Sequence, residues 1–163
     1  MRNNMKSPST HRKKTRELLM RLLFQMAAIA DWSDAARDAF LADETDWCGN
    51  PSADTPPGAL FDTATDEAPD LPYFLFGLDC VRGHLAEIDG EIEAASDKWR
   101  VARMAGVDLA ILRLALAEMR YMDGIDVRVS INEAVNLAKK YGSEKSPAFI
   151  NGILGQAAQK GGS

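Results

Sequence analysis

The sequence contains few of the residues on which reactive or metal-binding sites depend. Only two cysteines, Cys48 and Cys80, and two histidines, His11 and His84, are present. The cysteines lack zinc-type spacing, and we expect both to be reduced thiols of a cytosolic protein. No nucleophile elbow, P-loop, HExxH motif or glycine-rich dinucleotide loop occurs. We therefore expect no catalytic residues, no metal and no cofactor, and a binding protein rather than an enzyme.

Long apolar runs and strand-like alternation are also missing. The longest uncharged apolar run, Leu22 to Ala30, is too short to span a bilayer. The basic N-terminus has no apolar region closed by a cleavage site, so we expect no secretory signal. With 163 residues, 46% of them hydrophobic, the chain can bury one core. These features predict an all-α domain over residues 11–163, preceded by a mobile basic arm at 1–10.

Charge is divided unevenly along the chain, although the net charge is only -5. Residues 1–30 carry about +6, residues 31–97 about -15 and residues 98–163 about +4. The local field decides which partner binds, so overall acidity does not exclude a polyanion. If the first helix packs near the last two, the two positive ends would converge.

Helical periodicity covers most of the sequence. Gly83 and Gly90 weaken the predicted helix over 73–96, so we expect a break near one or the other. Residues 107–122 are apolar almost all round, which is typical of a central buried helix. Within that helix we expect Arg113 and Glu118 at the margins of the core. The predicted helices run from the basic cluster His11–Arg16 to Ala30, then over 32–41 with Ser33 as cap, 73–96, 107–122, 130–142 and 146–160.

Residues 42–72 differ in kind from the rest of the chain. They hold five of the seven prolines and are rich in Asp and Thr. We predict a long, acidic, mobile loop. An alternative is an electrostatic shield that mimics or repels nucleic acid.

The stretch from Ser130 to Lys160 predicts two helices joined by a tight, charged turn. Ser130 and Glu133 have the spacing of a capping box after an extended segment at 126–129. Gly142 would end the first helix in a left-handed conformation, and Ser146-Pro147 would start the second. Gly152 predicts the close approach of another helix.

Amines beside aromatic rings near this turn are typical of single-stranded nucleic acid binding. Lysine and arginine neutralise phosphates, and rings stack on splayed bases. For Phe149 a place in the core is an equally simple interpretation, and the basic cluster of the first helix could be only a solvated helix start. The candidate RNA-binding residues at this turn are Lys139, Lys140, Tyr141, Lys145 and Phe149.

Three segments resemble the NusB family of transcription antitermination factors. INEAVNLAKKYGSEKSPAFINGIL (131–154) is similar to the family's C-terminal INEAVELAK…FVNGVL signature. LAILRLALAEM (109–119) resembles its ILRLALYEL helix, and RKKTRELLMRLLFQM (12–26) resembles its arginine-rich first helix. The resemblance covers residues 11–30 and 70–160.

The resemblance implies a compact bundle of about seven helices in two three-helix-like subdomains. It also implies binding of boxA RNA in nascent ribosomal-operon transcripts together with NusE, a small-subunit ribosomal protein. That complex joins the RNA polymerase elongation complex with other Nus factors and suppresses termination. By position it adds four RNA-binding candidates, Arg12, Lys13, Lys14 and Arg16. It places the NusE surface at Phe24, Asp108 and Glu118.

Several residues depart from the family pattern. Lys145 stands where an acid is frequent, Ala117 replaces an aromatic residue, and Gly155 replaces an aspartate. Some relatives form homodimers that hide the partner surface, which is an alternative state for this chain. A second alternative is a protein-interaction adaptor that has lost RNA binding. Related helical domains also occur fused to RNA methyltransferases, and since we expect no such domain here, that activity would require a separate catalytic chain.

Overall fold

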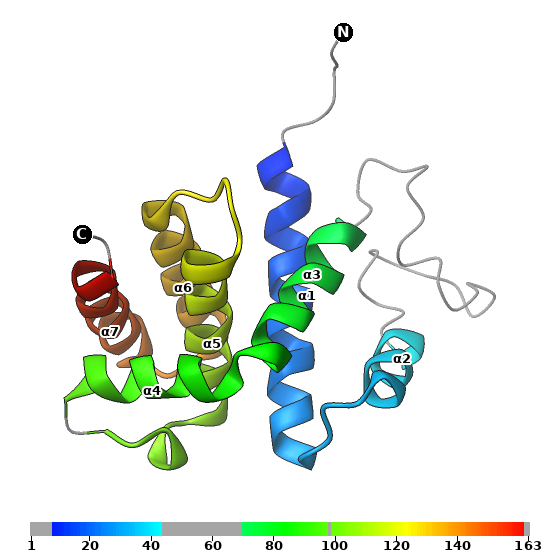
Figure 1. The fold of residues 1–163 in the computed structure, drawn as a ribbon, viewed down its shortest axis with the longest axis horizontal. Helices are drawn as coiled ribbons and strands as arrows, with labels where there is room; N and C mark the ends of the chain where they lie inside the picture. The colour runs from blue at the N-terminus through cyan, green and yellow to red at the C-terminus, as the bar shows by residue number, and fades with distance from the viewer. Residues whose placement is uncertain (1–7, 44–69, 98, 162–163) are drawn as a thin grey trace, which may run out of the picture. The chain divides into compact units, whose positions relative to one another are not determined.

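The computed structural model describes the backbone of residues 8–43, 70–97 and 99–161. Within these ranges the chain forms seven α-helices and one short 3-10 helix, with no strand, which confirms the all-α prediction (Figure 1). The elements are α1 (Pro8–Ile29), α2 (Asp34–Asp43), α3 (Leu71–Gly83), α4 (Leu85–Ser96), η2 (Val101–Arg103), α5 (Gly106–Tyr121), α6 (Val127–Tyr141) and α7 (Ser146–Gly161).

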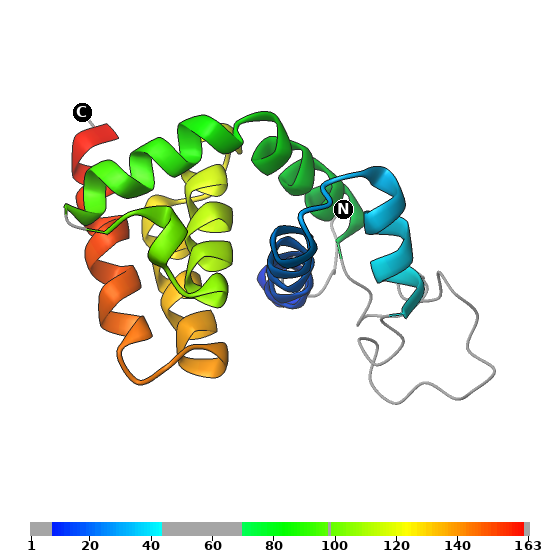
Figure 2. The same ribbon diagram turned by 90° about the horizontal axis from the view of Figure 1, so that it is seen from below.

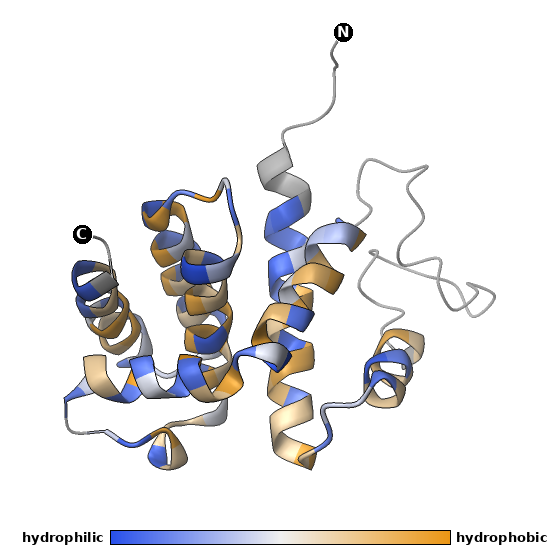
Figure 3. Ribbon diagram, in the orientation of Figure 1, coloured by the Kyte–Doolittle hydropathy of each residue, from blue (hydrophilic) through white to orange (hydrophobic). Residues whose placement is uncertain are grey.

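The chain divides into two compact units, Met1–Phe76 and Gly77–Ser163. In the first unit, α1 has a polar beginning and an apolar continuation, seen as blue and then orange ribbon in Figure 3. Its predicted apolar face is buried, because Leu18, Leu22 and Met26 are 0% exposed. Ser33 caps α2 as predicted, with its Oγ accepting the N–H of Ala36 at 3.1 Å.

In the second unit, α5 is the central helix. It packs against α4, α6 and α7, and α6 and α7 lie side by side as a helical hairpin (Figure 2). Seven apolar α5 residues between Ala110 and Ala117 are buried, as its continuous apolar pattern predicted. Glu118, expected at the margin of the core, lies inside it with 1% exposure, because the Ser130 hydroxyl satisfies its carboxylate. Arg113 reaches the edge of this core, where its Nε and Nη2 donate to the Asp89 carboxylate at 2.9 and 2.8 Å. This bidentate pair satisfies a charge that burial would otherwise penalise.

The predicted break near Gly83 is present, whereas Gly90 continues inside α4. His84 separates α3 from α4, and its ring stacks on Tyr121 with centroids 3.8 Å apart and planes 7° apart. This contact fixes the junction against the end of α5.

The predicted capping box at Ser130 is wrong. The α6 helix begins three residues earlier, at Val127, and Asp126 caps it by accepting the Arg128 N–H at 2.8 Å. The 126–129 segment is consequently helical and not extended. Ser130 lies inside the helix, where its hydroxyl donates to Glu118 Oε1 at 2.7 Å in the core.

Gly142 ends α6 as predicted, but for a different physical reason. Its φ of -91° and ψ of -170° are extended, so no left-handed conformation is involved. A Cβ there would lie 2.5 Å from both Cβ and Oγ of Ser146 and 2.9 Å from the Ala138 carbonyl oxygen. Ser146 in turn does not cap α7; its Oγ accepts the Ser143 N–H at 2.9 Å and closes the turn.

The close helix approach predicted at Gly152 is also wrong. A Cβ on Gly152 would meet nothing within 4 Å, and the residue is exposed. The same open surroundings apply to Gly155. Neither glycine is therefore required by packing among the described residues.

Two sequence predictions fall largely outside the described residues. Residues 1–7 contain most of the predicted arm and residues 44–69 most of the predicted acidic loop, while α1 already begins at Pro8. Cys48 is also outside, whereas burial, aided by the nearby Asp79 carboxylate, raises the pKa of the Cys80 thiol. Across the described helices, none has the length and apolar character that crossing a membrane requires.

Candidate nucleic-acid interface

The basic cluster of α1 is divided by burial. Lys13 is exposed, Arg12 and Lys14 are half-buried, and Arg16 is only 5% exposed. A phosphate can approach an exposed cation without displacing protein atoms. Lys13 therefore has the geometry best suited to the predicted RNA contact, and Arg16 the least suited.

Tyr73 accounts for the placement of both arginines. The guanidinium carbons of Arg12 and Arg16 lie 5.0 and 5.6 Å from the centroid of its ring. Tyr73 is only 4% exposed, so these cation–π contacts form against a largely desolvated ring. The two arginines thereby fasten the first turn of α3 to α1.

Asp70 joins the same two helices through three atoms. Its Oδ2 pairs with Arg12 Nη2 at 3.4 Å, and its backbone N–H donates to Thr15 Oγ1 at 2.6 Å. Its Oδ1 accepts the Tyr73 N–H at 3.1 Å and caps α3. The Nε of Arg12 is buried and has no hydrogen-bond partner within the described part of the chain. Arg12 is thus held by a carboxylate at the place where the family resemblance puts an RNA phosphate.

The turn between α6 and α7 carries the second group of predicted RNA-binding residues. Lys139, Lys140 and Lys145 are exposed, and Tyr141 is half-buried. The Nζ of Lys140 lies 5.5 Å from the centroid of the Tyr141 ring. The turn therefore brings three amines and one aromatic ring into a short segment, as single-strand binding requires.

Phe149 lies in the first turns of α7 and is half-buried. Its ring meets Trp99 edge to face, with centroids 5.9 Å apart and planes at 78°. Part of the Phe149 surface is therefore covered by a second aromatic ring and not by aliphatic core.

The three predicted partner residues have different environments. Phe24 is 40% exposed on α1. Asp108 is 8% exposed, and Glu118 is 1% exposed and bonded to Ser130. A partner protein would reach Phe24 in this conformation, but it would not reach the Glu118 carboxylate.

Sequence reasoning missed three residues of this region: Asp70, Tyr73 and Trp99. Asp70 precedes Leu-Pro at the start of a helix, which is a cap signal that could have been recognised. The partners of Tyr73 and Trp99 lie about fifty or more residues away in the sequence, so no local pattern could have identified them.

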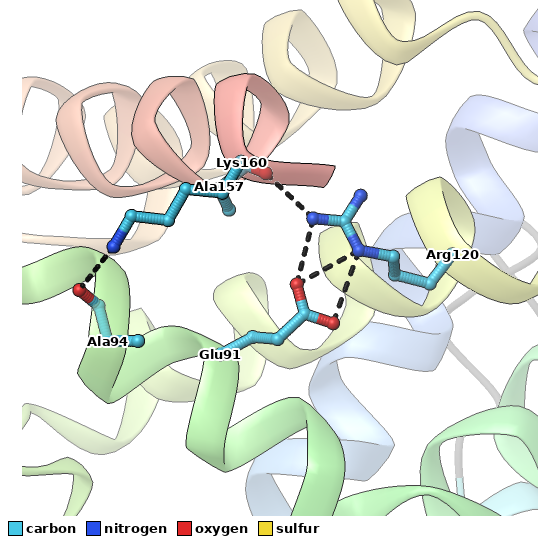
Figure 4. Close-up of a pocket in the computed structure, with 5 residues that line it drawn as sticks. All are labelled: Glu91, Ala94, Arg120, Ala157 and Lys160. Carbon is cyan, nitrogen blue, oxygen red and sulfur yellow. Dashed lines mark hydrogen bonds and ion pairs between the residues drawn. The ribbon is translucent and has the colours of Figure 1, made fainter. Parts of the chain in front are cut away.

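A small charged pocket lies where α4, α5 and α7 meet (Figure 4). Arg120 pairs with Glu91 at 2.8 Å and donates to the Ala157 carbonyl at 2.7 Å, while Lys160 donates to the Ala94 carbonyl at 3.1 Å. Both cations thus satisfy carbonyls near the C-terminal ends of helices. The polar groups of this pocket bind one another, which indicates a structural role.

The two groups of cations belong to different units, with Lys13 and its neighbours in the first and Lys139 to Lys145 in the second. Convergence of the two positive ends accordingly stays a prediction.

Comparison with known proteins gives a consistent match. A sequence model of the NusB family matches residues 13–159. The transcription antitermination protein NusB of Clostridium botulinum (strain Loch Maree / Type A3) is 36% identical over 146 residues, which cover 90% of this chain and 98% of that protein. Other curated relatives are 52–60% identical over shorter stretches, and there the chain spans about half to three-fifths of their length.

Two solved structures share the fold. NusB of T. maritima has a TM-score of 0.68 at 28% identity, covering 96% of this chain and 94% of that one. A structure of the antitermination factors NusB and NusE with double-stranded RNA contains a chain with a TM-score of 0.70 at 21% identity, covering 92% and 97%. The second likeness concerns the fold alone.

Proposed function

Because this chain belongs to the NusB family, we propose that it is an RNA-binding transcription antitermination factor. It binds the boxA element of nascent ribosomal-operon transcripts together with NusE and suppresses termination. The observation that carries the proposal is the match over nearly the full length of a NusB antitermination protein. It acts in the cytoplasm within the RNA polymerase elongation complex, alongside other Nus factors, and without catalytic turnover.

The charge of the described surface supports RNA as the ligand. Exposed lysines occur on α1 and at the α6–α7 turn, although the chain as a whole is acidic. In this proposal Lys13, Lys14, Lys139, Lys140 and Lys145 contact phosphates. Arg12 and Arg16 act mainly through Tyr73, by holding the helix that presents the lysines.

The protein partner is supported by a relative and by one exposed residue. A solved complex contains NusB with NusE and RNA. Phe24 offers an accessible aromatic side chain on α1, of the type enriched at protein interfaces. We accordingly assign Phe24, and not Glu118, to the contact with the ribosomal protein.

The test is a titration of boxA-containing single-stranded RNA against the protein, with and without the ribosomal partner, at several salt concentrations. We expect preference over a scrambled sequence and an affinity that falls with salt. Replacing Lys13 and Lys14 with glutamine should lower the slope of log affinity against log salt by up to roughly 0.7 per lost phosphate contact.

Lys160→Gln is the matched control, because that lysine donates to the Ala94 carbonyl and is not assigned to RNA. An unchanged salt slope in the Lys13/Lys14 variant would show that these lysines are only solvated. Absence of any boxA preference, with ribonuclease-insensitive capture of the ribosomal protein, would replace the proposal by the adaptor alternative.

A further inference from the structure

Trp99 is an exposed aromatic residue to which the proposed function assigns no role. It follows α4, two residues before η2, and is 50% exposed. An exposed indole offers a large apolar face on which a ligand can pack.

Hydrogen bonds fix the backbone around Trp99. Its carbonyl accepts the Ser96 hydroxyl at 2.7 Å, and the Val101 N–H donates to Glu93 Oε2 at 2.9 Å. The following turn closes with the Arg103 N–H on the Arg100 carbonyl at 2.9 Å. Hydrogen bonds therefore hold the backbone from Trp99 to Arg103, and binding would not require ordering these residues.

The exposed ring of Trp99 lies next to Phe149, which the sequence predicts to bind RNA. Trp99 meets Phe149 edge to face at 5.9 Å, and Phe149 is anchored in α7 with its N–H on the Lys145 carbonyl at 3.1 Å. Trp99 is exposed and Phe149 half-buried, so Trp99 is the more accessible ring of the pair. The pair links the α4–η2 segment to the lysine-bearing turn.

Cations outnumber acids in the two sequence segments that carry Trp99 and precede Phe149, although Glu93 also contacts the first segment. Residues 97–103, DKWRVAR, contain three cations and one acid, and residues 139–145, KKYGSEK, contain three lysines and one acid. Arg100 and Arg103 are exposed, and the Arg100 side chain retains 78% of its accessibility despite a 4.0 Å approach to Glu93. Lysine is depleted at protein–protein interfaces, whereas cations beside accessible rings are typical of single-strand binding.

We propose that Trp99 and Phe149 form a stacking platform for bases of single-stranded RNA, with Arg100 and Arg103 contacting the adjoining phosphates. The inference rests on the proposed RNA-binding function and extends its site to residues 99–103, which lie between the motif segments 12–26, 109–119 and 131–154. Only unpaired bases expose a face to such a platform, so duplex RNA would not use it.

The test uses the full-length protein in which Trp32→Phe and Trp47→Phe leave Trp99 as the only tryptophan. Saturating boxA single-stranded RNA, with the ribosomal partner present, should quench Trp99 emission and protect it from acrylamide. Trp99→Ala should weaken RNA affinity about five-fold or more, and Trp99→Phe should restore most of it. Phe76→Ala is the control, since Phe76 is 53% exposed but has no assigned RNA role.

The outcomes separate the two proposals. If RNA binds but Trp99 emission or the Trp99→Ala affinity is unchanged, the platform is wrong and the RNA-binding function stands. If only affinity for the ribosomal protein falls, Trp99 is a protein contact and the platform is likewise overturned. If the wild-type protein binds no RNA, the proposed function itself fails. Should Trp99→Ala not fold, the emission and acrylamide measurements decide.

Discussion

At the scale of single residues, Asp70 makes two contacts, a helix cap and an ion pair. Substitutions can distinguish the contribution of each to stability. The cap is the Oδ1 contact to the Tyr73 N–H, and the pair is the 3.4 Å contact to Arg12. Both side chains of the pair keep about a third of their accessibility, so the pair is screened by water and contributes little to stability. The cap should therefore carry most of the stabilisation.

We expect Asp70→Ala to lower the free energy of unfolding by about 1 kcal/mol, because the first turn of α3 loses its acceptor. Asp70→Asn keeps an acceptor oxygen and should cost less than half as much. Urea unfolding followed by circular dichroism measures both. Equal losses in the two variants would mean that the ion pair, and not the cap, is the stabilising contact.

The Asp70→Asn variant also bears on RNA. Removing the carboxylate leaves Arg12 available to a phosphate, so boxA affinity should be maintained or rise, with a steeper salt slope. A weaker affinity in a fully folded Asp70→Asn protein would show that Asp70 orients Arg12 for RNA and does not compete with it.

At the scale of elements, the helices could be predicted from the sequence, but the start of α6 could not. Apolar periodicity identified α1, α6 and α7 because each buries one broad face, and a nearly continuous apolar pattern identified α5. Ser130 was misassigned because S-x-x-E spacing is a local signal, whereas its actual partner, Glu118, is on another helix. Asp126 offered an equally good cap three residues earlier, and tertiary burial of Ser130 decided between them.

The two glycines of the closing hairpin should respond oppositely to alanine. At Gly142 a methyl group would collide with Ser146, so we expect Gly142→Ala to destabilise the protein by roughly 1–3 kcal/mol. At Gly152 the methyl group meets nothing and the residue is helical, so Gly152→Ala should stabilise by up to about 1 kcal/mol. Thermal unfolding of the two variants checks the prediction. A stable Gly142→Ala protein would require that Ser146 can move.

At the scale of the whole molecule, the sequence indicated the class of ligand better than the residues that bind it. The charge division and the three motifs pointed to RNA, and the lysines predicted for that role are exposed or half-buried. Arg16, predicted to bind RNA, and Glu118, predicted to contact the protein partner, are both buried. A sequence motif does not distinguish a charged residue that binds a ligand from one that holds two helices together, as Arg16 does through Tyr73 and Glu118 through Ser130. Trp99 gained its role from a contact across about fifty residues of sequence, and the pairing of Asp70 with Arg12 spans 58, although its cap of α3 is local.

Arg120 on α5 bridges Glu91 on α4 and the Ala157 carbonyl on α7, and this bridge affects the order in which the second unit folds. Arg120 lies 29 residues from Glu91 and 37 from Ala157, whereas α5, α6 and α7 follow one another through short turns. Long-range contacts close larger loops, so we expect them to form after the rate-limiting step. Arg120→Ala should then accelerate unfolding several-fold and leave refolding almost unchanged, as stopped-flow kinetics would measure.

Lys160→Ala, which removes one exposed contact, should change neither rate appreciably. A refolding rate that falls as much as the unfolding rate rises would instead place the bridge in the folding nucleus. If it forms late, Arg120 determines how long the native second unit persists, and has little influence on how quickly it is reached.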